Sequence, residues 1–294
     1  MKPVKLLVMS VGCCAENLTV RWAERLGGLK NVIVVLPKQY EKYKKTYTDK
    51  GIEVYVYDEQ KYINDDFEYF GFKPRNCGGI GRQGIAEAVE HYKSNGCLLL
   101  QMDDDTSTML VRIDCIGGSK TAVFRNWDDL ERIYNVFYKI YESCGVLMGA
   151  RTLCSVPKAG AFVQSYKLFN NFLMIPGNDC NFWGFGAYVS DDVRFNFYNA
   201  IYNRICMCGC VGVAIVFSKS QGVRDDGNAV VYNGDYSWKK MYALKMMFPW
   251  VVNTKFLREG DDRHPLFREN VEMAEVYPKI SLADKTGKVV AVAR

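Results

Sequence analysis

The sequence predicts an α/β fold in which helices cover both faces of a mostly parallel central sheet. Apolar segments of strand length at residues 5–10, 32–36 and 97–102 alternate with helix-like segments. The segment at residues 32–36 (VIVVL) is continuously apolar, which is typical of a strand buried on both faces. Buried strands that alternate with helices form a parallel sheet, so the expected architecture is Rossmann-like.

The first hundred residues give the clearest alternation. The expected elements are, in order, a strand at 5–10, a helix at 18–26, a strand at 32–36, a charged helix through Tyr40, Tyr43 and Tyr47, a strand at 52–57, a helix at 84–92 and a strand at 97–102. Asn17 is a favoured N-cap residue for the first helix, and Gly27-Gly28 is a typical helix end.

After residue 105 the pattern becomes mixed. The expected elements are strands at 108–113 and 121–124 joined through Gly117-Gly118, a helix at 127–143, a strand at 146–150, a helix at 195–205 and a strand at 211–217. The chain contains no linker, repeat or low-complexity segment. We therefore expect one domain over residues 1–294, with a mixed C-terminal half.

Composition limits the cellular setting. The longest apolar runs are far shorter than the ~20 residues that cross a bilayer, and Lys5 interrupts the apolar start of the chain. The 11 cysteines are scattered through a long chain, which indicates reduced thiols and a cytoplasmic, soluble protein. The alternate spacing of Cys206, Cys208 and Cys210 would place all three on one face of a strand, and we interpret them as buried thiols because no second ligand pair accompanies them. The net charge of +5 permits an anionic partner.

Three consecutive aspartates, Asp103, Asp104 and Asp105, directly follow the apolar strand LLLQM. Adjacent carboxylates repel one another, so a bound cation favours them. In open α/β sheets ligands bind outside the carboxyl ends of the strands, and Mg²⁺ or Mn²⁺ prefers oxygen ligands there. If the strand continues, Asp103 and Asp105 point the same way and hold the metal. A solvated acidic turn is the alternative.

Residues 75–84 (RNCGGIGRQG) form a glycine-rich segment before an expected helix. Backbone N–H groups at such a helix start bind phosphate, and Arg75 and Arg82 add guanidinium donors. The same glycines also match G-x-G-x-x-G, and Asp103 follows Gly84 at nearly the spacing of a ribose-binding acid. An NAD-dependent oxidoreductase is therefore an alternative, although residues 66–76 provide no apolar strand before the glycines.

The segment R-N-x-G-G-I-G-R-Q followed by a strand ending in D-D-D resembles the TET/JBP-associated glycosyltransferases, a group with the GT-A fold that includes the base J glucosyltransferase. The resemblance covers about residues 1–200, and its specific part is residues 75–105. It implies a metal-dependent transfer of sugar from a nucleotide-sugar donor to a hydroxyl, with 5-hydroxymethylpyrimidine in DNA as the acceptor. Gln83 stands where many members have a second arginine.

The resemblance also implies a nucleotide-sugar-binding half at residues 1–105 and an acceptor-binding half at residues 106–294. It assigns the metal, Mn²⁺ or Mg²⁺, to Asp103 and Asp105. The expected nucleotide-sugar-binding residues are Ser10, Asp58, Arg75, Gly79, Gly81, Arg82, Gln83 and Asp104.

An acidic residue after the glycine-aromatic stretch NFWGFG is implied as the general base. Asp191 and Asp192 fit this position, and the alternative is an N-cap for the helix expected at 195–205. Basic residues interleaved with aromatic ones later in the chain are candidates for DNA contact: Lys219, Arg224, Lys239, Lys240, Lys245 and Lys255. Proteins, saccharides and small molecules are the alternative acceptors.

Overall fold

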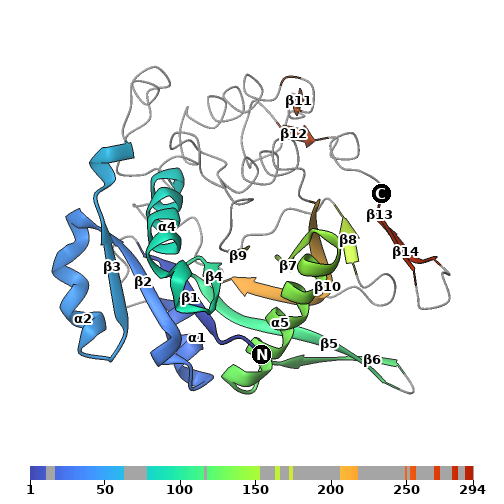
Figure 1. Cartoon of the computed structure of the whole chain (residues 1–294), viewed down its shortest axis with the longest axis horizontal. Helices are drawn as coiled ribbons and strands as arrows, with labels where there is room; N and C mark the ends of the chain where they lie inside the picture. The colour runs from blue at the N-terminus through green and yellow to red at the C-terminus, as the bar shows by residue number, and fades with distance from the viewer. Residues whose placement is uncertain are drawn as a thin grey trace, which may run out of the picture.

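The computed structural model of the chain describes residues 1–10, 17–62, 78–115, 118–152, 163–165, 172–174, 206–217, 249, 252–255, 268–271, 280–283 and 289–293. Its N-terminal part is an α/β unit and the following part contains a second, mixed sheet (Figure 1).

The first sheet has the strand order β3-β2-β1-β4-β9. Its strands are β1 (Val4–Met9), β2 (Val32–Pro37), β3 (Glu53–Tyr57), β4 (Leu98–Met102) and β9 (Phe172–Met174). Neighbours from β3 to β4 pair in parallel, and β9 is antiparallel to β4. This confirms the predicted α/β class with a parallel central sheet, which is consistent with a Rossmann-like fold.

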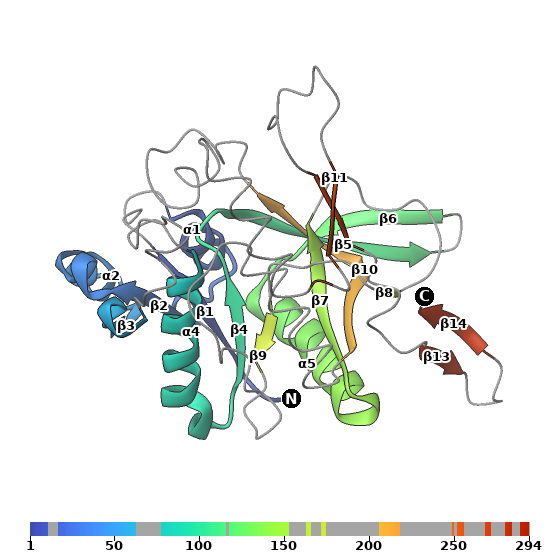
Figure 2. The ribbon, with the colours of Figure 1, turned by 90° about the horizontal axis from the view of Figure 1, so that it is seen from above.

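The central strands are buried because helices cover both faces of the sheet. Every residue of β2 and β4 is buried. Helices α1 (Leu18–Arg25) and α4 (Gly78–Tyr92) lie on opposite sides of β1 and β4 (Figure 2). This follows from right-handed crossovers, since the chain moves outward from β1 to β3 and then returns across the sheet to β4.

Short helical turns fill the connections between these strands. They are η1 (Leu29–Asn31), η2 (Lys38–Tyr43), α2 (Lys44–Thr48), η3 (Glu59–Tyr62) and η5 (Lys93–Asn95). The single charged helix expected through Tyr40 and Tyr47 is therefore a 3₁₀ segment followed by a short α-helix. Asn17 caps α1 as predicted, and Gly27 follows α1 with a φ of 71°, a conformation that favours glycine.

The second sheet has the order β6-β5-β10-β7, with β8 also paired to β10. Its strands are β5 (Thr106–Cys115), β6 (Gly118–Val123), β7 (Val146–Thr152), β8 (Val163–Ser165) and β10 (Cys206–Phe217). β10 is parallel to β7 and antiparallel to β5, so this sheet is mixed. β10 begins before the predicted strand and includes the three alternating cysteines.

Two small antiparallel pairs complete the described strands. β11 (Val252–Lys255) pairs with β12 (Arg268–Val271), and β13 (Ile280–Ala283) pairs with β14 (Val289–Ala293). The helix predicted at residues 195–205 lies outside the described residues.

Helix α5 (Trp127–Cys144) packs beside β7 and is fixed to the start of β1 (Figure 2). The Asn135 side chain accepts from the Lys2 backbone N–H and donates to the Lys2 carbonyl, both at 2.8 Å. Glu131 accepts from the Val4 N–H at 2.9 Å. The buried apolar residues of both sheets belong to one cluster, and the proposed division into two functional halves stays a prediction.

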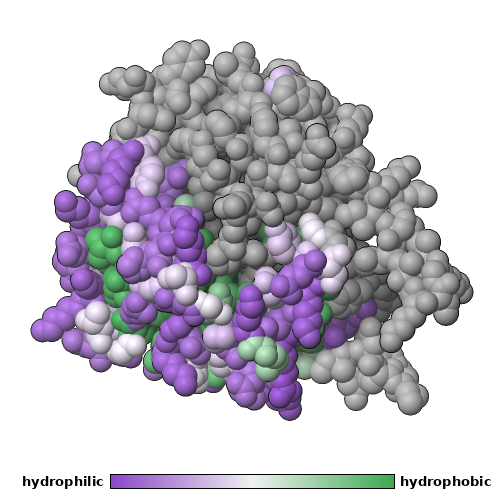
Figure 3. Space-filling view, viewed as in Figure 1, coloured by the Kyte–Doolittle hydropathy of each residue, from purple (hydrophilic) through white to green (hydrophobic). Residues whose placement is uncertain are grey.

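Within the described part of the chain, no helix combines the length and apolar character that crossing a membrane requires. On the face in Figure 3, hydrophilic residues cover most of the described surface.

Candidate functional site

The carboxyl ends of β1 and β4 form the topological switch point of the first sheet. The chain leaves β1 toward β2 and β3 on one side, and β4 pairs with β1 on the other side. Val8 of β1 is in register with Met102, the last residue of β4. Ligands of open α/β sheets bind in the crevice at such a point. Asp103, Asp104 and Asp105 follow β4 directly and therefore lie beside it.

The three aspartates leave the sheet as a turn. β4 ends at Met102, β5 begins at Thr106, and Asp104 and Asp105 have turn conformation. The strand therefore does not continue through the aspartates, so the condition under which Asp103 and Asp105 would point the same way is not met. All three aspartates are partly exposed.

Hydrogen bonds to the N-terminus of α1 hold the backbone of this turn. The Asp104 carbonyl accepts from the N–H groups of Leu18 at 2.9 Å and Thr19 at 3.3 Å. These N–H groups have no partner within a helix, so an outside carbonyl satisfies them. The Thr19 hydroxyl donates to the Asp103 carbonyl and accepts from the Thr106 N–H at 3.0 Å. Thr19 therefore fixes the backbone at both ends of the turn.

Arg82 and Gln101 both contact the Asp103 carboxylate. The Arg82 Nη2 atom is 3.2 Å from Asp103 Oδ1, and Gln101 donates to the same oxygen at 3.1 Å. Arg82 is only 4% exposed, and such a buried cation needs an anionic partner. Arg82 therefore contacts the acidic turn through Asp103, and its role as a phosphate ligand stays a prediction.

Gln101 is a functional candidate that the sequence analysis missed. It is fully buried, and in the described structure its Oε1 atom has no hydrogen-bond partner while its Nε2 atom holds Asp103. The available signal was a polar residue within the otherwise apolar strand LLLQM. A buried acceptor beside partly exposed carboxylates suits a ligand that brings a cation or a donor.

The acidic turn fits a hard divalent cation by its donor set. Mg²⁺ and Mn²⁺ take oxygen ligands, commonly one or two carboxylates together with substrate phosphates. Among the described residues, no three His, Cys, Asp or Glu side chains are arranged to hold a metal ion. A metal ion that also takes oxygen ligands from a diphosphate needs only one or two carboxylates from the protein.

The predicted phosphate-binding glycines lie within α4. The helix begins at Gly78, so Gly79 and Gly81 belong to its first turn, where backbone N–H groups lack helical partners. A Cβ atom at Gly81 would lie 1.8 Å from the Met9 sulfur, and one at Gly84 would lie 2.4 Å from the Tyr57 ring. Gly81 and Gly84 thus let α4 pack closely on the sheet, a role that residue spacing did not reveal. Gln83 is partly exposed beside them.

Ser10 is fully buried at the end of β1. Its N–H donates to the Val35 carbonyl at 3.1 Å, and its hydroxyl lies 3.1 Å from the Tyr47 hydroxyl. Asn17 donates to the same Tyr47 hydroxyl at 3.4 Å. Ser10 therefore takes part in the internal support of the switch point, and its contact with a nucleotide stays a prediction.

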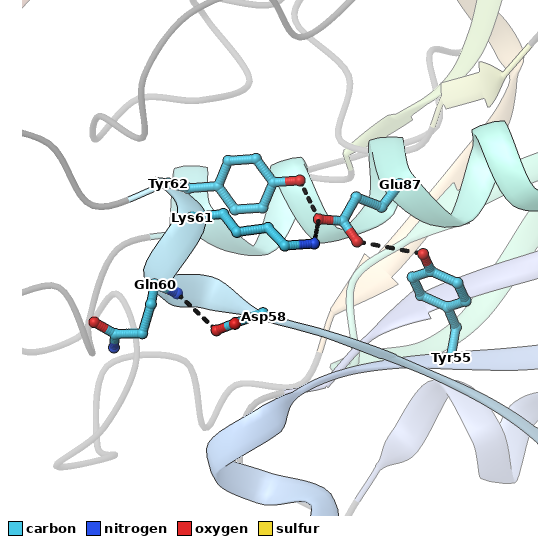
Figure 4. Close-up of polar contacts among 6 residues, drawn as sticks. All are labelled: Tyr55, Asp58, Gln60, Lys61, Tyr62 and Glu87. Carbon is cyan, nitrogen blue, oxygen red and sulfur yellow. Dashed lines mark hydrogen bonds and ion pairs between the residues drawn. The ribbon is translucent and has the colours of Figure 1, made fainter.

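Asp58 follows β3 and caps the turn after it. Its Oδ1 atom accepts from the Gln60 N–H at 3.2 Å (Figure 4). Beside this turn, Glu87 of α4 accepts from the hydroxyls of Tyr55, at 3.3 Å, and Tyr62, and it pairs with Lys61 at 3.6 Å (Figure 4). Burial, followed by the contact with Glu87, raises the pKa of both tyrosines.

Several predicted residues lie outside the described part of the chain: Arg75, Asp191, Asp192, Lys219, Arg224, Lys239, Lys240 and Lys245. Lys255 is the last residue of β11. Of the predicted site, the structure therefore brings together Arg82 and the three aspartates, with Ser10 at the neighbouring strand end.

The dinucleotide alternative requires a strand that leads directly into the glycines at the switch point. The preceding described strand, β3, is at one end of the sheet order, and it ends at Tyr57, well before Gly78. Residues 63–77, which would have to supply that strand, lie outside the described part of the chain.

No protein-family model matches the chain, and no curated protein matches it. A solved structure described as the crystal structure of a mycobacterial protein aligns with 92% of this chain and 83% of its own, with 10% identity and a TM-score of 0.41. A likeness at this level carries no argument about function.

Proposed function

We propose that this chain is a metal-dependent glycosyltransferase with a GT-A-type fold, which moves a sugar from a nucleotide-sugar donor to a hydroxyl. The observation that carries the proposal is the acidic turn of Asp103, Asp104 and Asp105 at the switch point between β1 and β4. An acidic turn that only water solvates would be an ordinary surface feature. Here α1 holds its backbone through Leu18 and Thr19, and Arg82 holds one of its carboxylates.

The residues around the turn have distinct roles in this proposal. Asp105, with Asp103, would hold Mn²⁺ or Mg²⁺, and the ion would supply neutralisation of charge on the diphosphate leaving group. Arg82 and Gln101 orient Asp103. The first turn of α4 presents backbone N–H groups, including that of Gly79, which suit a donor phosphate.

The proposed acceptor is the hydroxyl of a 5-hydroxymethylpyrimidine in DNA, with Asp191 or Asp192 as the general base. This part rests on the resemblance in residues 75–105. Only the modified base presents a primary hydroxyl, and the enzyme would have to extrude the base from the stack, at a cost of a few kcal/mol. A protein, saccharide or small molecule is the alternative acceptor.

The metal assignment is tested by calorimetry of a panel of nucleotide sugars in the presence of Mn²⁺. Asp105→Ala should weaken Mn²⁺-dependent donor binding by more than about a hundredfold, since loss of even an outer partner of a metal site costs ten- to a hundredfold. Asp128→Ala is the matched control, because Asp128 is an exposed aspartate on α5. Equal donor affinity in Asp105→Ala and wild type would refute the assignment, and tight metal-independent NADH binding would replace it with the dinucleotide alternative.

The acceptor is tested separately. Hydroxymethylcytosine and hydroxymethyluracil DNA should each be incubated with the donor panel and Mn²⁺, and the nucleosides analysed by mass spectrometry. We expect a sugar mass increment on modified DNA and none on unmodified DNA. Transfer only to a protein or saccharide would remove DNA as the acceptor and leave the glycosyltransferase assignment in place.

A further inference from the structure

The exposed surface of η2 and α2, residues 38–50, is strongly basic, and we refer to it as the lysine surface. It carries five lysines and only two acidic residues, Glu41 and Asp49. All five lysines are exposed, and within the described part of the chain none has an ion-pair partner: Lys38, Lys42, Lys44, Lys45 and Lys50. Unneutralised positive charge of this density attracts a polyanion.

Two tyrosines lie among these lysines. The rings of Tyr40 and Tyr43 are stacked, with centroids 6.2 Å apart and an interplanar angle of 22°, and both side chains are half-buried. The Lys42 ammonium lies 5.0 Å from the centre of the Tyr43 ring. Aromatic side chains within a basic surface are typical of nucleic-acid contacts, because they stack on bases while the cations meet phosphates.

The lysine surface begins at the edge of the sheet that carries the acidic turn. η2 follows the carboxyl end of β2, and only β1 separates β2 from β4, a distance of about 10 Å between strand axes. Gln39 donates to Glu59 of η3 at 2.8 Å, which connects η2 to the neighbouring strand end. From there α2 continues along the outer side of β3, at the left margin of Figure 1. A duplex bound at the acidic turn would therefore lie at the same edge of the sheet as the start of the lysine surface, at Lys38.

An anionic membrane is the competing polyanion, and the composition of this segment disfavours it. Helices that bind membrane surfaces bury a face of large apolar residues in the lipid. Residues 38–50 (KQYEKYKKTYTDK) contain no Leu, Ile, Val, Met, Phe or Trp. Tyr47, the third tyrosine of the segment, is buried in the protein core.

We propose that the lysine surface binds the phosphate backbone of DNA next to the proposed transfer site. The charge and stacking arguments stand on this surface alone, whereas the choice of DNA among nucleic acids rests on the proposed function. None of its five lysines is among the later basic residues named above as candidates for DNA contact.

The test is fluorescence anisotropy of the full chain with an unmodified DNA duplex, measured over a range of salt concentrations. In the triple variant Lys42→Gln, Lys44→Gln, Lys45→Gln, we expect roughly tenfold weaker binding. The slope of log affinity against log salt should flatten by about 0.9 for each phosphate that the variant no longer neutralises. Thermal unfolding of each variant checks that the fold is retained.

A control variant neutralises Arg132 and Lys139, two exposed cations on α5, which packs against the other sheet. The variant Arg132→Gln, Lys139→Gln should keep the wild-type slope, which separates a local contact from an effect of net charge. Equal affinity and slope in the lysine variant and wild type would overturn the proposal, as would binding to phosphatidylserine vesicles with none to DNA. Donor calorimetry with Mn²⁺ tests the acidic turn independently, so failure of one proposal does not imply failure of the other.

Discussion

Two of the ion pairs that helix α4 makes differ in burial. Arg82 and Asp103 have side chains that are 5% and 23% exposed, whereas Lys61 and Glu87 are 61% and 22% exposed. Water solvates the free Lys61 ammonium almost as well as Glu87 does, so an exposed pair contributes little to stability. Water cannot solvate the buried Arg82 guanidinium in the same way. Removing one partner of a buried pair is therefore strongly destabilising. Burial therefore decides which pair the fold depends on.

The two carboxylates also differ in their neutral partners. Asp103 also receives a side-chain donor from Gln101, and its backbone is held by Thr19. Glu87 receives the hydroxyls of Tyr55 and Tyr62, which join β3, η3 and α4 (Figure 4). Glu87 therefore matters to the fold mainly through its tyrosines, and Asp103 mainly through Arg82.

The largest effect is expected from Arg82→Met. The substitution keeps an unbranched apolar stem but leaves Asp103 without its cation, so we expect the free energy of unfolding to fall by about 3–5 kcal/mol. Urea denaturation measures this change. The double variant with Asp103→Asn should recover part of the loss, because the unpaired carboxylate is then gone. A loss below about 1 kcal/mol for Arg82→Met would show that the pair is solvated.

An intermediate effect is expected from Glu87→Gln. The glutamine oxygen still accepts one hydroxyl, so we expect a loss of about 1 kcal/mol near neutral pH. The pH dependence is more specific. The pKa values of Tyr55 and Tyr62 are raised, first by burial and then by Glu87, so the stability they add is present below about pH 10 and falls above it.

Removing the Glu87 charge brings the pKa values of Tyr55 and Tyr62 in the folded state closer to those in the unfolded state. Stability of Glu87→Gln should therefore fall less steeply above about pH 10 than stability of the wild type. Urea denaturation across alkaline pH, with ultraviolet titration of the tyrosines, measures both quantities. If the free energy of unfolding falls equally steeply with pH in Glu87→Gln and wild type, burial alone raises the pKa values of these tyrosines.

The smallest effect is expected from Lys61→Gln. Because the lysine is 61% exposed, we expect a change within about 0.5 kcal/mol, and an even smaller one at high salt. Lys93→Gln, which removes the exposed pair with Glu90 inside one helical segment, is the control and should behave alike. A loss comparable to that of Arg82→Met would contradict the role we assign to burial.

The sequence by itself determined the elements that depend on neighbouring residues. Continuous apolar runs gave β2 and β4, and Asn17 capped α1 as expected, because strand burial and helix capping are local patterns. The sequence also predicted that the three aspartates follow a central strand, because this prediction depends only on the order of elements along the chain. Local patterns did not give the boundaries of α4 or β10.

Only the tertiary structure decided which groups meet at the site. The acidic turn leaves the strand because the N-terminus of α1, distant in sequence, takes the Asp104 carbonyl. Arg82 pairs with Asp103, and Gly81 packs on Met9, because α4 crosses back over β1 on its way to β4. Such partners are set by the crossing of whole elements, and a buried charge then takes the nearest opposite charge that the crossing provides. The spacing of residues along the chain does not predict how these elements cross.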